Sequence, residues 1–396
     1  MFVNRPGFRL VSISVVRSAR CASTKFQEGD LVLLRSLARP DKVSLSKPLE
    51  KDGQLSVPDG KIEHNDLIGS FPRSTILQSH RRKDRYMAVH PTLEEYISLS
   101  DRDAQPIYAP DAAAIVSMMD IHVDYPALSH SGELLEKPLQ YLEAGSGHGS
   151  FSIAMARAIH AANCHATESK PELRGAILHS IDNRELHSKR AAKTVKNFKR
   201  GMYSKNVEFH VAESPSSWLT GEDSAKYRKL SNDLQLDDRL ESEFAFLSGA
   251  FLDMADSHLE IKEVAKSLKH DAPLVIFTPS ITQIMEAIKL VQEDRDIKLT
   301  FVRCAEITSG AGGGMREWDT RLTYVRKTGE QVAVCRPKVG IRVQGGGFIG
   351  MFKKIPNDSR PKKDEAATES EAEINAKITL KQEGIAEDES LDNVEK

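Results

Sequence analysis

The stretch that decides the fold is Leu139-Gln140-Tyr141-Leu142-Glu143-Ala144-Gly145-Ser146-Gly147-His148-Gly149. Its first residues predict an apolar strand over 139–143, and the residues that follow it predict a helix over 151–159. The three glycines between them let the backbone turn sharply and approach a ligand, while the N-terminus of the helix presents free N–H groups. This pattern predicts a Rossmann-like α/β domain with a nucleotide-like ligand at the turn.

Acidic residues stand at the ends of three successive predicted strands. Glu143 precedes the glycines, where it would repel the pyrophosphate of a dinucleotide and would suit the ammonium and sulfonium of S-adenosylmethionine. Asp182 ends the strand predicted at 176–182 and can accept hydrogen bonds from ribose hydroxyls. Glu213 follows the strand predicted at 207–211 and can receive the adenine amino group. Together the acids predict S-adenosylmethionine as cofactor, against a nucleotide oxidoreductase as the alternative.

The predicted cofactor site therefore combines the turn with these acids. The expected contacts from the turn itself are Gly145, Ser146, Gly147, His148 and Gly149. Asp182 taken alone has a helix cap or a surface acid as its alternative, and Glu213 has a surface acid as its alternative.

Strands and helices alternate along the chain in the manner of βαβ units, which predicts a mostly parallel sheet. Two further strands are expected at 244–253 and 273–278, with residues 220–242 as an inserted polar loop. A helical pattern begins at Pro91, and Pro110 starts another helix. The methyltransferase domain is predicted to cover residues 91–355.

A small β-rich domain is predicted at residues 26–90. It opens with a strand at 29–35 and continues through a polar, Pro- and Gly-containing loop at 41–61. The last residues, 356–396, are rich in acidic and small residues and are expected to be a disordered tail.

The leader at residues 1–25 contains arginines and serines but no acid, which is typical of a mitochondrial transit peptide. A disordered basic tail has the same composition and is the alternative. The transit-peptide interpretation places the protein in the mitochondrial matrix.

The overall composition excludes several classes of function. The net charge is -2 and 28% of the 396 residues are charged, so the chain as a whole attracts neither nucleic acid nor membrane strongly. The four cysteines are scattered and no His or Cys pair has metal-ligand spacing, so neither a disulfide framework nor a metal site is expected. No stretch approaches the roughly 18 apolar residues of a membrane span.

Beyond the glycine turn, the sequence resembles the tRNA adenine-N1 methyltransferases that modify the T-loop adenine at tRNA position 58. The matching blocks occur in the family's order, from about residue 29 to about residue 290. They are residues 29–35, 64–69, 91–96, 104–115, 142–149, 180–184, 251–253 and 279–284. The resemblance implies a small N-terminal β module, a Rossmann-like catalytic domain, and assembly as a homotetramer or as a heterotetramer with a non-catalytic paralogue.

The resemblance also assigns roles on the substrate side. Asp253 matches the family's catalytic acid, which would stabilise the positive charge that develops on the adenine during methylation. Gln105 and Tyr108 match positions that line the site: Gln105 is expected to contact the cofactor, and Tyr108 offers a stacking surface for the flipped adenine.

The sequence departs from the family near the substrate. Residues 254–258 replace a Trp-bearing loop after the catalytic acid, and His148 stands where a small Ser or Thr is usual. In the glycine-rich segment 309–318, Arg316 and Trp318 could clamp RNA, although a plain hairpin loop explains the composition equally well. The cofactor acids are retained, so cofactor binding is predicted more firmly than substrate identity.

The first hypothesis is therefore a mitochondrial methyltransferase that forms 1-methyladenosine in tRNA, with mitochondrial rRNA as another possible substrate. A non-catalytic RNA-binding or assembly subunit on the same fold is the main alternative. A decayed paralogue would have no reason to keep Glu143, Asp182 and Asp253 together, which favours catalysis. Methylation of a small molecule or a protein is disfavoured by the family-like N-terminal module.

Overall fold

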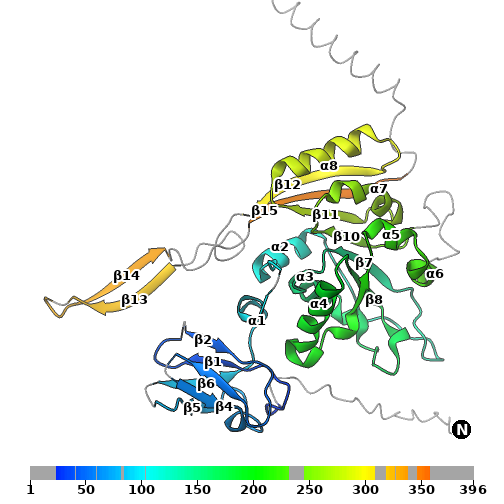
Figure 1. Cartoon of the computed structure of the whole chain (residues 1–396). Coiled ribbons are helices and arrows are strands. Elements are labelled where there is room, and N and C mark those ends of the chain that lie inside the picture. Colours follow the sequence, from blue (N-terminus) through cyan, green and yellow to red (C-terminus); the bar gives the residue numbers. More distant parts are fainter. Residues whose placement is uncertain are drawn as a thin grey trace, which may run out of the picture.

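The structure is a computed structural model that describes residues 24–356, apart from 41, 59, 82–83, 103, 232–244, 308–317, 326 and 338–345. Figure 1 shows a central sheet flanked by helices, a smaller β module near the N-terminus, and a two-stranded arm that projects from the body. The predictions for the leader, for the acidic tail after residue 356 and for Arg316 fall outside the described residues.

The central sheet has seven strands in the order β12-β15-β11-β10-β7-β8-β9. Its strands are β7 (Leu139–Ala144), β8 (Ala176–Asp182), β9 (Val207–Val211), β10 (Gly249–Leu252), β11 (Pro273–Thr278), β12 (Leu299–Ile307) and β15 (Gly347–Lys354). Strands β7 to β11 pair in parallel, and β15 runs antiparallel between β11 and β12. Strand order reverses between β7 and β10, and in sheets of this kind ligands bind outside the carboxyl ends of the strands at such a switch point.

Helices cover both faces of this sheet through two separate apolar clusters (Figure 1). One face carries α2 (Ala109–Met118), α3 (Ser150–Ala158) and α4 (Glu185–Asn197). The other carries α5 (Pro215–Thr220), α6 (Ala225–Ser231), α7 (Ser257–Ser267) and α8 (Ile281–Glu293). Parallel strands buried on both faces read as near-continuous apolar runs, and β8 and β10 are buried at every position.

The structure confirms the strands expected at 139–143, 176–182, 207–211 and 273–278. The strand expected at 244–253 is shorter, because β10 begins only at Gly249. The backbone N–H groups of Phe246 and Leu247 instead donate to the carbonyl oxygen of Ser267, each at 2.9 Å, at the end of α7. The first part of the apolar run thus contacts the end of α7, and only its second part, from Gly249, joins the sheet.

The interpretation of 220–242 as a loop is wrong for its first half. A 3-10 turn at Glu222–Ser224 leads into α6, and residues 232–244 lie outside the described part. The short helix forms because Tyr227 is buried against the rings of Trp218 and His179, with centroid distances of 6.0 and 4.4 Å. Because α6 has one buried aromatic residue among mostly charged or polar ones, its sequence does not show the apolar spacing that predicts a helix.

The N-terminal module contains a four-stranded antiparallel sheet in the order β2-β1-β6-β5 and a hairpin of β3 with β4. The strands are β1 (Leu33–Ser36), β2 (Val43–Leu45), β3 (Gln54–Val57), β4 (Gly60–Glu63), β5 (Ile76–Gln78) and β6 (Arg85–Val89). The expected strand at 29–35 starts later, since Gly29 adopts a φ of +85° in a turn.

The expected loop at 41–61 is also wrong, because it contains β2, β3 and the start of β4. Strand β3 buries Leu55 and Val57 and exposes Gln54 and Ser56. Alternation over only four residues is too short to stand out from a polar background.

The β module is tied to the central domain by two specific contacts. Arg200, just after α4, makes a bidentate ion pair with the buried carboxylate of Asp30, with both N···O distances at 2.6 Å. On the connecting helix α1 (Leu93–Leu99), the hydroxyl of Tyr96 donates to the carbonyl of Thr194 on α4 at 2.8 Å. These contacts place the module beside α4.

The arm consists of β13 (Trp318–Tyr324) paired antiparallel with β14 (Gln331–Pro337), and it lies apart from the seven-stranded sheet in Figure 1. Within the described residues, no helix is both long and apolar enough to cross a membrane.

Candidate active site

The glycine turn lies at the carboxyl end of β7 and is packed against the end of β10. Gly145 has a φ of +96°, and a Cβ on it would overlap the carbonyl oxygen of Asp253 and lie 3.0 Å from the carbonyl carbon. The N–H of Asp253 in turn donates to the carbonyl of Ala144 at 2.9 Å. Glycine is therefore required at 145, and the turn and the proposed catalytic acid are held together by backbone contacts.

The other two glycines of the turn have distinct constraints. Gly149, with a φ of +82°, starts α3, and a Cβ there would lie 2.8 Å from the Cα of Ala191 on α4. Gly147 has a φ of +46° but more open space, with Ala104 as its nearest side-chain neighbour at 3.7 Å. Ser146 is buried, and its hydroxyl lies 2.7 Å from that of Ser180.

Glu143 is fully buried directly beneath this turn. Its carboxylate accepts a hydrogen bond of 2.6 Å from the hydroxyl of Ser152 on α3. The pKa of Glu143 is raised to about 8, first by burial and to a smaller extent by the nearby carboxylates of Asp253 and Asp182, while hydrogen bonds from Ser152 and Ser180 oppose the rise. No Lys or Arg of the described residues pairs with it, so the site has a place for a ligand cation.

Replacing Glu143 with Gln measures how much the raised pKa of this buried acid lowers the free energy of unfolding. An acid whose pKa is raised by folding destabilises the folded state as the pH rises from its unfolded pKa to its folded pKa. Between pH 4.5 and about 8, cofactor-free wild-type protein should therefore lose about 1.4 kcal/mol of unfolding free energy per pH unit relative to Glu143→Gln. Urea unfolding of both proteins at pH 5, 6, 7 and 8 measures the difference; curves that stay parallel across this range would contradict it.

Asp182 lies at the carboxyl end of β8 and is buried. Its carboxylate accepts hydrogen bonds from the backbone N–H of Gly147 at 3.1 Å and from that of Arg184 at 2.9 Å. His187 on α4 lies 3.6 Å from it. Asp182 is thus joined to the glycine turn and is not a surface acid.

Glu213 follows β9 and is exposed. The segment containing it is positioned at the same edge, because the N–H of Ala212 donates to the backbone carbonyl of Asp182 at 3.2 Å. The structure therefore brings the side chains of Glu143, Asp182 and Asp253 close enough to interact, whereas the side chain of Glu213 is exposed.

Asp253 directly follows β10 at the switch point of the sheet. Burial raises the pKa of its carboxyl group to about 6. At neutral pH the carboxylate is still charged but poorly solvated, so a ligand that develops positive charge beside it would be stabilised.

The segment before α2 carries Gln105 and Tyr108, which the sequence resemblance assigns to the site. Tyr108 is buried at the N-cap of α2, and its hydroxyl accepts a hydrogen bond of 2.8 Å from Arg102. Gln105 is exposed. His148 of the glycine turn is only 6% exposed, and its Nε2 lies 3.1 Å from the hydroxyl of Ser100.

The sequence predicts that His148 contacts the cofactor as part of the turn, and its burial is not predicted by the sequence. Burial and the guanidinium of Arg102 lower the pKa of His148, while the backbone of Asp101 opposes this. The neutral imidazole therefore fastens the substrate-side segment to the cofactor turn.

Trp318 lies on β13 and is 52% exposed. The structure does not bring it to the glycine turn, because its strand belongs to the projecting arm (Figure 1). Its predicted contact with RNA therefore depends on the arm.

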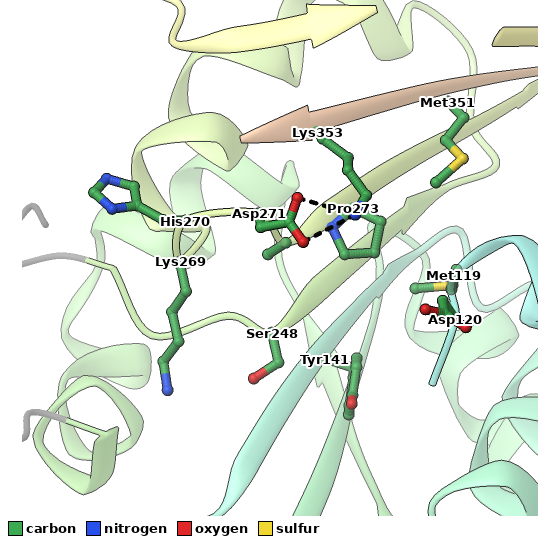
Figure 2. Close-up of a pocket in the computed structure, with 11 residues that line it drawn as sticks. Met119, Asp120, Tyr141, Ser248, Lys269, His270, Asp271, Pro273, Met351 and Lys353 are labelled. Carbon is green, nitrogen blue, oxygen red and sulfur yellow. Dashed lines mark hydrogen bonds and ion pairs between the residues drawn. The ribbon is translucent and has the colours of Figure 1, made fainter. Parts of the chain in front are cut away.

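A separate cavity of about 290 Å³ opens at the opposite edge of the sheet, where β7, β10 and β11 begin (Figure 2). It is lined by Tyr141, Ser248 and Lys269, and an ion pair of 2.9 Å between Lys353 and Asp271 crosses it. This cavity is remote from the glycine turn and the three acids. No cluster of metal-binding side chains occurs among the residues that the structure places.

Sequence reasoning missed the residues that support the acids. Ser152 and Ser180 are completely buried, one on α3 and one on β8, and both hold Glu143. A serine inside an otherwise apolar strand or helix next to a buried acid was the available signal. Arg102 gave no such signal, since its partner Tyr108 is recognised only in the folded chain.

Comparison with known proteins agrees with this architecture. No protein-family model matches the chain. The tRNA (adenine(58)-N(1))-methyltransferase TrmI from two strains of Thermus thermophilus is 26% identical over 274 residues, which are 69% of this chain and 82% of that enzyme.

Two solved structures share the fold. An S-adenosylmethionine-dependent O-methyltransferase from Thermotoga maritima has a TM-score of 0.55 at 19% identity, over 86% of this chain and 97% of its own. The TrmI tRNA methyltransferase from Aquifex aeolicus has a TM-score of 0.50 at 20% identity, over 84% of this chain and 99% of its own. The predicted fold class is confirmed: the chain has the fold of S-adenosylmethionine-dependent methyltransferases, and it is homologous to TrmI.

Proposed function

We propose that the protein is an S-adenosylmethionine-dependent methyltransferase that forms 1-methyladenosine in RNA, with the T-loop adenine of tRNA as its substrate. The convergence of Glu143, Asp182 and Asp253 around the glycine turn carries the proposal. The homology to TrmI, a tRNA (adenine(58)-N(1))-methyltransferase, supports the choice of substrate.

The residues of the site fit this cofactor by charge. Glu143 is a buried carboxyl group with no Lys or Arg partner among the described residues, and the ammonium and sulfonium of S-adenosylmethionine would favour its ionised form. Asp182 can accept hydrogen bonds from the ribose hydroxyls. The N–H groups of Gly145 and Gly149 donate to the carbonyls of Ile181 and Ser146, so glycine at these two positions permits the close packing of the turn that carries the cofactor site.

Bound S-adenosylmethionine would supply an electrophilic methyl group. Adenine N1 has no proton to lose before it attacks, so the protein's task is to orient the two partners and to stabilise charge. Asp253 would accept a hydrogen bond from the exocyclic amine and stabilise the positive charge that passes to the ring. Tyr108, fixed by Arg102, would support the flipped base.

We expect Asp182→Ala to weaken cofactor binding about ten- to a hundredfold, because hydrogen bonds to a charged group contribute roughly 1.5–3 kcal/mol. Calorimetric titration with S-adenosylhomocysteine measures the change. Glu185→Ala is the matched control, since Glu185 is an exposed acid three residues later, paired with Lys189 at 2.7 Å. Equal affinities for the two variants would remove Asp182 from the cofactor site.

The substrate is tested by mapping 1-methyladenosine by mass spectrometry in mitochondrial tRNA and rRNA, with and without the protein. Loss of the modification at the T-loop adenine of tRNA supports the proposal. Loss at an rRNA site alone would show that the substrate is rRNA and not tRNA. Undetectable cofactor binding by folded protein lacking residues 1–25 would overturn the methyltransferase assignment.

The cellular setting is part of the same proposal. The acid-free, Arg-containing leader supports import into the mitochondrial matrix. We propose a tetramer on the strength of the sequence resemblance, and size-exclusion chromatography with light scattering on the purified chain distinguishes a homotetramer from a subunit that needs a paralogue.

A further inference from the structure

A second cavity, of about 450 Å³, lies between the β module and the central domain. We call it the interdomain cavity. Its walls are the loop after β2, the segment at the end of α1, the exposed side of α4, and Gly147 and His148 of the glycine turn. It falls in the size range of pockets that enclose whole ligands, roughly 300–1,000 Å³, and it adjoins the proposed cofactor site.

The charge of the interdomain cavity is opposite to that of the cofactor site. Lys47 of the β module and Arg190 and Lys193 of α4 line it, against one carboxylate among its described lining residues, that of Asp101. No ion pair involves Lys47 or Lys193 in the described parts of the chain. These two ammonium groups come from separate domains and face one space, so they would attract an anion there.

Because the cofactor site is acidic and the interdomain cavity is basic, the two sites favour ligands of opposite charge. The acids beneath the glycine turn suit the cationic end of the cofactor, whereas the lysines of the interdomain cavity suit phosphate. We propose that the interdomain cavity binds the sugar-phosphate backbone of the RNA strand next to the adenine that is methylated. The inference rests on the proposed function and adds to it a location for the substrate.

The fixed position of the β module supports this role. The ion pair of Arg200 with Asp30 and the hydrogen bond of Tyr96 with Thr194 hold the module against α4. Lys47 and Lys193 are therefore held in position before RNA arrives, which lowers the entropy cost of binding. The β module would thus form one wall of the substrate site.

The test compares two double variants of the full chain with the same loss of charge. Lys47→Ala with Lys193→Ala removes the cations that line the interdomain cavity. Lys189→Ala with Lys196→Ala removes two cations of α4 that do not line it. Fluorescence anisotropy with a tRNA transcript at several salt concentrations gives the RNA affinity, and calorimetry gives the affinity for S-adenosylhomocysteine.

We expect the cavity variant to bind tRNA more weakly and its log–log salt dependence to become shallower by about two, one for each lost phosphate contact, with unchanged cofactor affinity. The control should keep a steeper salt dependence than the cavity variant. Equal RNA binding by the two variants overturns the inference, as does a loss of cofactor affinity alone, which would assign the cavity to the cofactor's carboxylate. Failure of the wild-type protein to bind tRNA would instead refute the proposed function.

Discussion

Replacement of Asp253 with Ala should abolish nearly all methyl transfer while the protein still binds its cofactor. Removal of one preorganised group that stabilises transition-state charge costs about 10²–10³-fold in turnover. Asp253 is proposed to contact the substrate and not the cofactor, and the backbone contacts that it makes with Gly145 and Ala144 do not depend on its side chain. Single-turnover transfer of a labelled methyl group to a tRNA transcript measures the rate, and calorimetry with S-adenosylhomocysteine measures binding.

Asp253→Asn separates charge from hydrogen bonding, because the amide oxygen can still accept from the exocyclic amine of adenine. Its turnover should lie between those of wild type and Asp253→Ala. Burial raises the pKa of Asp253 to about 6, so the folded state pays to keep this carboxylate ionised at neutral pH. Asp253→Asn should therefore be more stable than wild type above pH 6, by about 1–3 kcal/mol.

The pH dependence follows from the same shift. The carboxylate is present above its pKa and is lost as the pH falls, so wild-type kcat/KM should decline below pH about 6. This decline should be missing from the residual activity of Asp253→Asn. Turnover of Asp253→Asn equal to wild type would show that the charge of Asp253 is not needed for methyl transfer, and a loss of stability in this variant would contradict the cost of burying the carboxylate.

The central sheet was predictable because its signal is local. Buried parallel strands such as β10 and β11 are nearly continuous apolar runs, and each is followed by a loop at the same edge of the sheet. An acid directly after such a strand is therefore placed near the acids of the neighbouring strands by topology alone. Glu143, Asp182 and Asp253 converge for this reason.

The parts that sequence reasoning missed depend on contacts between distant residues. His148 is buried because Ser100 and its segment fold over it, 48 positions away in the chain. The helix around Tyr227 is stabilised because the ring of Tyr227 packs against His179 and Trp218, which are distant in the sequence. The interdomain cavity combines Lys47 with Lys193, and neither lysine differs from a surface residue until the β module is docked on α4.

The turn itself gives the second large effect, because Gly145→Ala should eliminate cofactor binding and destabilise the protein. The added methyl group would overlap the carbonyl oxygen of Asp253, and the φ of +96° is unfavourable for alanine. Overpacking and a left-handed backbone each cost about 1–3 kcal/mol, so the free energy of unfolding should fall by roughly 3 kcal/mol or more. Urea unfolding and calorimetric titration measure the two effects.

Gly132→Ala is the matched control for backbone strain. Gly132 has a φ of +83°, close to that of Gly145, but a Cβ there meets nothing within 4 Å. This variant should lose only about 1–2 kcal/mol of stability and should bind S-adenosylhomocysteine with wild-type affinity. The difference between the two variants isolates the close approach of β7 and β10, which brings the cofactor turn and Asp253 into one site. If Gly145→Ala were no more damaging than Gly132→Ala, that approach could not be what holds the site together.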